Sequence, residues 1–90
     1  SLNNLVVSST DLNPGHSTSG HKHDGQEEVY LFIKGSGKMC LTYLDGNKNE
    51  FVVNKGDIIL IEDGVHHKVS NTSIDENLYF ICVFDGTRQH

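Results

Sequence analysis

The chain has 90 residues, 36% of them hydrophobic, and a formal net charge of −5 at pH 7. This length leaves room for one domain, so we expect residues 1–90 to form a single domain. Its seven Lys and Arg residues never adjoin, which argues against nucleic acid and anionic membranes as partners. Neither a membrane-spanning apolar stretch nor a signal peptide is evident. The sequence therefore predicts a cytoplasmic protein.

Short β-rich runs separated by turn signals follow one another along the chain, and no window shows the period of an amphipathic helix. In chain order we expect strands at Leu2–Val7, Gly20–His23, Glu28–Lys34, Lys38–Leu44, Asn49–Val53, Asp57–Glu62, His66–Ser70 and Asn77–Phe84. About eight short strands without helices predict an all-β fold of the sandwich, barrel or jelly-roll type.

The expected strand at Gly20–His23 carries the first candidate metal ligands. Residues two apart on a strand project from the same face, so the imidazoles of His21 and His23 can reach one ion together. A turn at Gly25 can bring Glu28, at the start of the next strand, beside them. Two imidazoles and a carboxylate form a mixed nitrogen and oxygen ligand set for a transition metal.

The expected strand at Glu28–Lys34 alternates between two fairly apolar faces. Glu28, Tyr30 and Phe32 share one face, and the residues between them share the other. We expect one face to line the interior and the other to be covered by a second sheet or a second subunit. Gly35 marks a tight turn after this strand, and the pair Asp45-Gly46 marks a hairpin farther on.

The next expected strands carry a histidine pair and two cysteines. Because adjacent strand residues face opposite sides, only one of His66 and His67 can point inward. Cys40 and Cys82 each lie inside an apolar run, far from metal-binding spacing, so we expect two free buried thiols.

The spacing of the first histidines resembles a known family motif. The first motif of the cupin superfamily has two glycines that flank a His-x-His pair and a glutamate. Gly15, His21, His23, Glu28 and Gly35 stand at the spacings of that motif.

The second cupin motif follows in order. Gly56, Gly64, His67 and Asn71 match it, whereas Glu62 stands where the family usually has proline. That departure removes a rigid turn residue and concerns the shape of the loop.

The resemblance implies a small cupin of jelly-roll β-barrel fold, with the motifs at residues 15–35 and 56–71. It implies that His21, His23, Glu28 and His67 hold one divalent transition metal ion, which could be Mn, Fe, Co, Ni, Cu or Zn. It thereby selects His67 over His66. Four protein ligands would leave one or two coordination positions open for a small polar molecule in the barrel.

Three classes of function remain open from the sequence. The first is an enzyme, with a sugar or sugar-phosphate isomerase ahead of an iron-type dioxygenase, in which Tyr30, Glu27 or Glu62 would transfer the proton. The second is a non-catalytic metal-dependent binding module, and the third is a structural metal domain. We also expect a homodimer, since a barrel of this size exposes edge strands and an apolar outer face that need cover.

Overall fold

The computed structural model describes residues 4–20 and 27–86. Within them the chain forms strands and no α-helix. The strands are β1 (Leu5–Leu12), β2 (Glu28–Lys34), β3 (Ser36–Thr42), β4 (Lys48–Asn54), β5 (Ile58–Ile61), β6 (His66–Ser70) and β7 (Leu78–Asp85). The predicted all-β fold is confirmed. The strand expected at Gly20–His23 falls outside the described residues except for Gly20, which is not in a strand.

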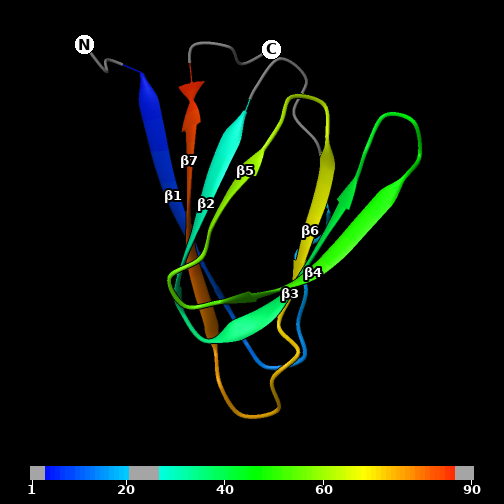
Figure 1. The fold of residues 1–90 in the computed structure, drawn as a ribbon. Helices are drawn as coiled ribbons and strands as arrows, with labels where there is room; N and C mark the ends of the chain where they lie inside the picture. The colour runs from blue at the N-terminus through cyan, green and yellow to red at the C-terminus, as the bar shows by residue number, and fades with distance from the viewer. Residues whose placement is uncertain (1–3, 21–26, 87–90) are drawn as a thin grey trace.

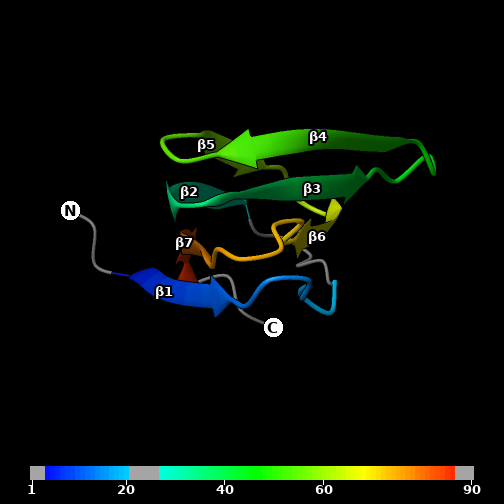
Figure 2. The same cartoon turned by 90° about the horizontal axis from the view of Figure 1, so that it is seen from below.

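The seven described strands form two antiparallel sheets. A four-stranded sheet has the order β1-β7-β2-β5, and a three-stranded sheet has the order β4-β3-β6. Figure 1 shows the sheets converging at the bottom of the view and diverging upward. Seen from below, the larger sheet lies on the left and the smaller one on the right (Figure 2). A two-layer arrangement of this kind buries one face of each sheet.

The core follows from the alternation of apolar residues along the strands. On β2 the buried positions are every second residue, Glu28, Tyr30 and Phe32, as the pattern predicts. On β6 the buried positions are His67 and Val69. The inward faces meet in one apolar cluster that also contains Met39, Leu41, Val53, Ile61, Val65, Leu78, Phe80 and Cys82.

Between β2 and β3 the chain passes from one sheet to the other through a single residue. β2 ends at Lys34, β3 begins at Ser36, and Gly35 between them has a φ of 86°. Since L side chains rarely adopt this left-handed conformation, glycine meets the turn without strain. The backbone of Gly35 also lies directly against that of Asn77 and Leu78. The turn that the sequence predicts here is therefore also the corner of the two layers.

Other turns agree with the sequence as well. The Asp45-Gly46 hairpin is closed by a hydrogen bond of 2.8 Å from Tyr43 N to Asn47 O, and Gly46 has a φ of 88°. Between β5 and β6, Val65 N donates to Glu62 O at 3.2 Å, and Gly64 has a φ of 79°. This loop closes without the proline that the second motif usually has at the position of Glu62.

One boundary is wrong by several residues. The first strand was expected at Leu2–Val7, but β1 runs from Leu5 to Leu12 and includes the polar run Ser8–Asp11. β1 is an edge strand with most of its residues exposed. Backbone pairing with β7 forms it, and the hydrophobic pattern does not register such pairing. No helix that could cross a lipid bilayer occurs in the part of the chain that the structure describes.

Candidate metal centre

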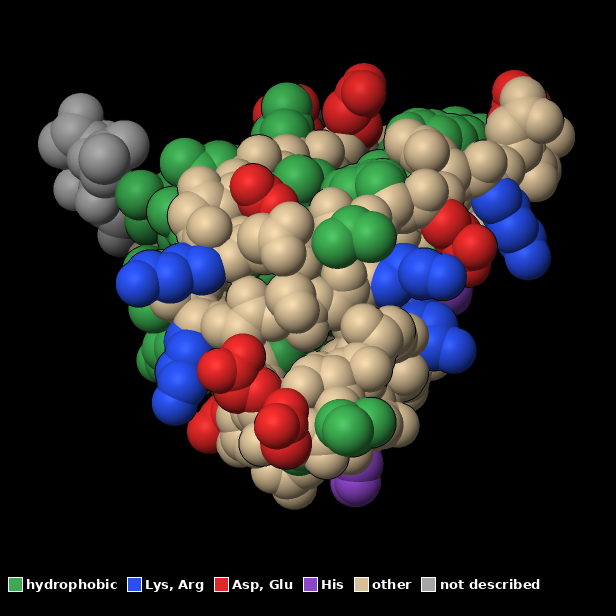
Figure 3. Space-filling model, turned by 60° about the horizontal axis from the view of Figure 1, so that its bottom comes forward, with side chains coloured by type: hydrophobic (Ala, Val, Ile, Leu, Met, Phe, Trp, Pro, Cys, Tyr) green, Lys and Arg blue, Asp and Glu red, His purple; other side chains and the backbone are tan. Residues whose placement is uncertain are grey.

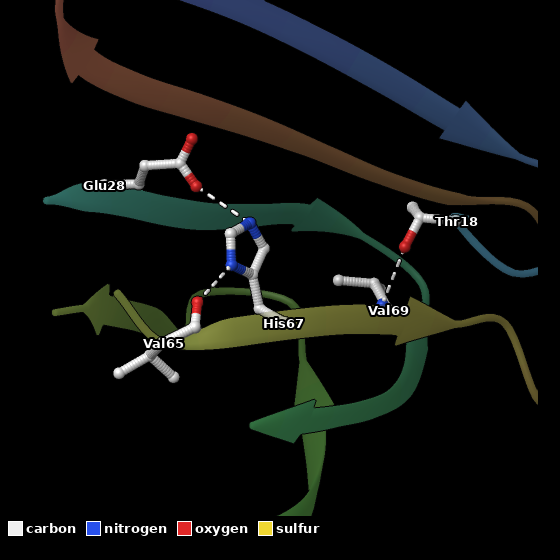
Figure 4. Close-up of polar contacts among 5 residues, drawn as sticks. All are labelled: Thr18, Glu28, Val65, His67 and Val69. Atoms are coloured by element: carbon white, nitrogen blue, oxygen red, sulfur yellow. Dashed lines mark hydrogen bonds and ion pairs between the residues drawn. The ribbon is translucent and has the colours of Figure 1, made fainter. Parts of the chain in front are cut away.

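Two of the four expected metal ligands meet in the interior. Glu28 is the first residue of β2 and His67 the second residue of β6, so they come from different sheets. Their side chains are 3% and 2% exposed, and His67 Nε2 lies 2.9 Å from Glu28 Oε2 (Figure 4). Removing a carboxylate and an imidazole from water costs free energy, and close polar contacts must offset that cost. The structure therefore brings the two side chains together as a metal centre requires.

The contact made by Nδ1 of His67 determines whether Nε2 carries a proton. His67 Nδ1 lies 3.1 Å from the carbonyl oxygen of Val65, which can only accept a hydrogen bond, so Nδ1 carries the proton. In a neutral ring, the lone pair of Nε2 then faces Glu28. Metal-binding histidines commonly donate their other N–H to a carbonyl in this way. An imidazole nitrogen and a carboxylate oxygen suit a first-row transition metal, so both residues fit a divalent ion.

The neighbouring histidine points the other way. His66 is exposed on β6, whereas His67 is buried, so the expectation that one of the pair points inward is confirmed, with His67 as that one. The His66 ring lies near Gly20, where an added Cβ would be 2.9 Å from His66 Cε1. Alternation along the strand thus separates two chemically identical side chains.

The segment before the first motif histidine runs along β6. Thr18 N donates to Val69 O at 2.9 Å, and Val69 N donates to Thr18 Oγ1 at 3.0 Å (Figure 4). Asn71 N also donates to His16 O at 2.8 Å. His21 and His23 themselves lie outside the described residues. Within residues 4–20 and 27–86, no group of three or more His, Cys, Asp or Glu side chains could hold a metal.

Tyr30, an expected proton-transfer residue, lies beside the buried pair. Its ring meets the His67 ring edge-on at 5.5 Å between centroids and stacks on Phe80 at 5.3 Å. Burial raises the pKa of the Tyr30 hydroxyl well above its usual range, and the charge of Glu28 raises it further. The hydroxyl therefore stays protonated at neutral pH.

Cys82 is a neighbour that the sequence did not single out for the site. It is free and buried, and it pairs with Tyr30 across β7 and β2. Burial, followed by the charge of Glu28, raises the pKa of Cys82 to about 12. The sequence would have revealed Cys82 only if the pairing of β2 with β7, and the inward face that they share, had been predicted. Cys40 is also free, as expected, but is only half-buried, on the outer face of β3.

We expect the two thiols to differ in reactivity. The thiolate is the nucleophile, so the buried and protonated Cys82 should resist a disulfide reagent at pH 8 that modifies Cys40. Native protein should release about one equivalent of chromophore, and unfolded protein should release two. The Cys40→Ser and Cys82→Ser variants show which thiol reacts in the native protein and which reacts only after unfolding. If Cys40→Ser reacted as fast as Cys82→Ser in the native state, the protection of Cys82 would be disproved.

Glu62, another expected proton-transfer residue, lies elsewhere. Its side chain is exposed, in contrast to Glu28 and His67. It borders an open pocket of about 340 Å³ that is also lined by Tyr43, Leu44, Asp45, Asp63 and Val65.

Asn71, the last residue of the second motif, has a structural role. Its Nδ2 donates to Leu12 O and Glu76 O at 3.0 and 2.8 Å, and its Oδ1 accepts from Ser73 N. It thus ties three segments at the end of β6.

With the fold and the buried pair described, the chain can be compared with known proteins. The model of the Cupin domain family matches residues 8–84. The chain belongs to the cupin family. The predicted jelly-roll, or double-stranded β-helix, architecture is thereby confirmed.

Individual cupins share only part of their length with this chain. It is 31% identical to the oxalate-binding protein of Thermotoga maritima over 72 aligned residues. These residues make up 80% of this chain and 54% of that protein. The crystal structure of a predicted oxalate decarboxylase of Thermotoga maritima has a TM-score of 0.77 at 28% identity, covering 89% of this chain and 64% of the other. A Klebsiella pneumoniae protein with a double-stranded β-helix domain reaches 0.83 at 19% identity, covering 98% and 72%, which shows the fold alone.

Proposed function

We propose that this cupin binds a small chelating carboxylate of the oxalate class through one divalent transition metal ion held by His21, His23, Glu28 and His67. The observation that carries the proposal is the buried contact of 2.9 Å between His67 Nε2 and Glu28 Oε2. The Val65 carbonyl also supports the proposal. It keeps the proton of a neutral His67 ring on Nδ1, which leaves the lone pair of Nε2 available to bind a metal ion.

The motif spacing supports the other two ligands. The described chain stops at Gly20, which lies beside His66 and Lys68 on β6, and resumes at Glu27, next to β2. His21 directly follows Gly20, and His23 precedes Glu28 by five positions. The proposal includes both histidines because, with Glu28, they stand at the spacings of the first cupin motif.

The coordination chemistry suits a chelating ligand. Three imidazoles and one carboxylate leave two positions on a six-coordinate ion, and a dicarboxylate can occupy two neighbouring positions. A bound ion would supply Lewis acidity to the oxygens of such a ligand. Around it, the chain contributes the apolar rings of Tyr30 and Phe80, which exclude water and strengthen the electrostatic attraction.

A carboxylate replaces the sugar or sugar phosphate that the sequence favoured as a substrate. The two Thermotoga maritima proteins described above are named for oxalate. Turnover is a separate question from binding. The protonated hydroxyl of Tyr30 can donate a hydrogen bond but is a poor base at neutral pH, and Glu62 is exposed. Binding is therefore the function that the described residues favour, ahead of isomerase or dioxygenase chemistry.

The test is calorimetric titration of oxalate into the protein, first stripped of metal and then loaded with Mn²⁺. We expect oxalate to bind only the loaded protein, and acetate, which cannot form the five-membered chelate ring of oxalate, to bind at least about 100-fold more weakly. Glu28→Gln should lose the response, whereas Glu27→Gln, the exposed neighbour, should keep it. Equal binding to stripped and loaded protein would refute the proposal, and a preference for a sugar phosphate would favour the isomerase hypothesis.

A further inference from the structure

Three buried polar groups lie together on the inward face of β2 and β7. Glu28 and Tyr30 are two residues apart on β2, and Tyr30 pairs with Cys82 on β7. The three side chains are 3%, 4% and 8% exposed. Glu28 and Cys82 are therefore diagonal neighbours across the two strands, close enough for a long side chain to reach the other. The metal centre proposed above uses only Glu28 of the three.

Hydrogen bonds join these groups in a definite order. Tyr30 shares one with Cys82, and Cys82 shares another with Glu28. An ionised carboxylate can only accept, so the thiol of Cys82 donates to Glu28. The single proton of the thiol is then in use, so the hydroxyl of Tyr30 donates to the sulfur. The chain of donors thus runs from Tyr30 through Cys82 to the Glu28 carboxylate.

The Glu28 carboxylate has different neighbours on its two sides. Oε2 faces His67 Nε2 at 2.9 Å. In Figure 4 the other oxygen points away from His67, toward the side on which β7 runs, and β7 carries Cys82. One side of the carboxylate therefore faces the histidine, and the strand of the thiol lies on the other.

A glutamate carboxylate does not fix its own orientation. Its last side-chain torsion is broad and roughly two-fold, so the surroundings decide which oxygen meets an ion. The acidic side chains in Figure 3 lie at the surface, where water can hydrogen-bond to either oxygen. Glu28 is buried, so protein groups must take the place of that water. Hydrogen bonds of this kind orient metal ligands and raise their affinity for the ion.

We propose that Cys82 is a positioning residue of the metal centre, whose thiol holds the Glu28 carboxylate with Oε2 turned toward the ion. Tyr30 acts through Cys82, because its hydroxyl donates to the sulfur and limits the rotation of the thiol. The inference rests on the proposed function for the metal ion alone, and not for the ligand that the ion binds. It gives Tyr30 and Cys82 a role that requires no proton transfer.

The test uses Co²⁺ alone, because its visible absorption reports the arrangement of its ligands. Cys82→Ala should bind Co²⁺ at least about 10-fold more weakly than wild type and with an altered spectrum. Cys82→Ser keeps a donor at this position, so it should restore the spectrum and bring the affinity within about threefold of wild type. Cys40→Ala, a thiol substitution on the outer face of β3, is the matched control and should behave as wild type.

A double variant tests the order of the chain of donors. Tyr30→Phe keeps the ring and removes only the hydroxyl, so it should weaken Co²⁺ binding about threefold. In the Cys82→Ala background the same substitution should have no further effect, because Tyr30 acts through the thiol that is already gone. Independent packing defects would instead add in free energy.

Thermal unfolding without metal shows whether each variant keeps its fold. Wild-type affinity and spectrum in Cys82→Ala would overturn the inference and leave the metal centre intact. A loss that Cys82→Ser does not restore would also overturn it, by assigning Cys82 to packing. If Cys82→Ala did not fold, Tyr30→Phe would decide, since an unchanged affinity there contradicts the chain of donors. Wild type that binds no Co²⁺ would refute the proposed function and the inference with it.

Discussion

Replacing His67 with Ala should lower the affinity for a divalent metal ion at least about 100-fold, whereas His66→Ala should leave it within about threefold. His67 is buried with Nε2 2.9 Å from Glu28, but His66 is exposed on the opposite face of β6. Loss of groups that merely orient a ligand already costs about 10- to 100-fold, and His67 would be a ligand itself. Competition with a chromophoric chelator measures both affinities.

Two observations guard this comparison. His67→Ala leaves Glu28 buried beside a cavity. Far-UV circular dichroism and thermal unfolding without metal must therefore show that this variant keeps its fold. The two histidines are neighbours with the same side chain, so once the fold is shown to persist, the difference between the variants reports which face of β6 holds the ion. Equal losses of affinity in the two variants would place the ion elsewhere and contradict the ligand set.

Among the Gly→Ala substitutions at described glycines, Gly35→Ala should lower the free energy of unfolding most. An added Cβ would lie 2.3 Å from the carbonyl oxygen of Asn77 and 3.2 Å from Leu78 Cα, both of them backbone atoms that cannot rotate away. The φ of 86° adds strain of about 1–2 kcal/mol for an L residue. Overpacking costs about 1–3 kcal/mol more. Together they remove a large part of the stability of a small domain.

Gly46→Ala is the matched control. Gly46 has nearly the same φ, 88°, but nothing lies within 4 Å of its added Cβ. Only the backbone strain remains, so this variant should lose about 1–2 kcal/mol. Urea unfolding followed by circular dichroism compares the two free energies of unfolding. If Gly35→Ala were as stable as Gly46→Ala, the close approach at the corner of the sheets would have no energetic weight.

The buried strands could be predicted well from the sequence because burial leaves a pattern. β2 and β6 have the expected bounds, Glu28–Lys34 and His66–Ser70, since their alternating residues are fixed by the core. β1 was shifted because its pairing with β7 involves Ser8–Asp11, whose side chains bury little surface. Backbone hydrogen bonds that form an exposed edge strand leave no hydrophobic signal.

The candidate site shows the same division. His67 could be identified because strand alternation allows only one of the two histidines to point inward and the motif spacing selects His67. The Cys82 thiol could not, because it lies beside Tyr30 only through the pairing of β7 with β2, which are distant in sequence. The Val65 carbonyl is only two residues from His67, but its contact with Nδ1 depends on the orientation of the His67 ring, which no sequence pattern shows. Tyr30 and Glu62 were equal candidates in the sequence, yet one is buried and the other exposed. Turn residues carry no periodic pattern that tells inside from outside.

The strand order has a consequence for synthesis and folding. The last described strand, β7, lies between β1 and β2, so the four-stranded sheet lacks an interior strand until β7 has been made. On the ribosome, β1 must wait unpaired for a partner more than sixty residues away in sequence. Pairings of such long sequence separation form slowly because loop closure precedes any gain from contact. Truncation near Leu78 would leave β1 detached and expose an aggregation-prone edge on β2.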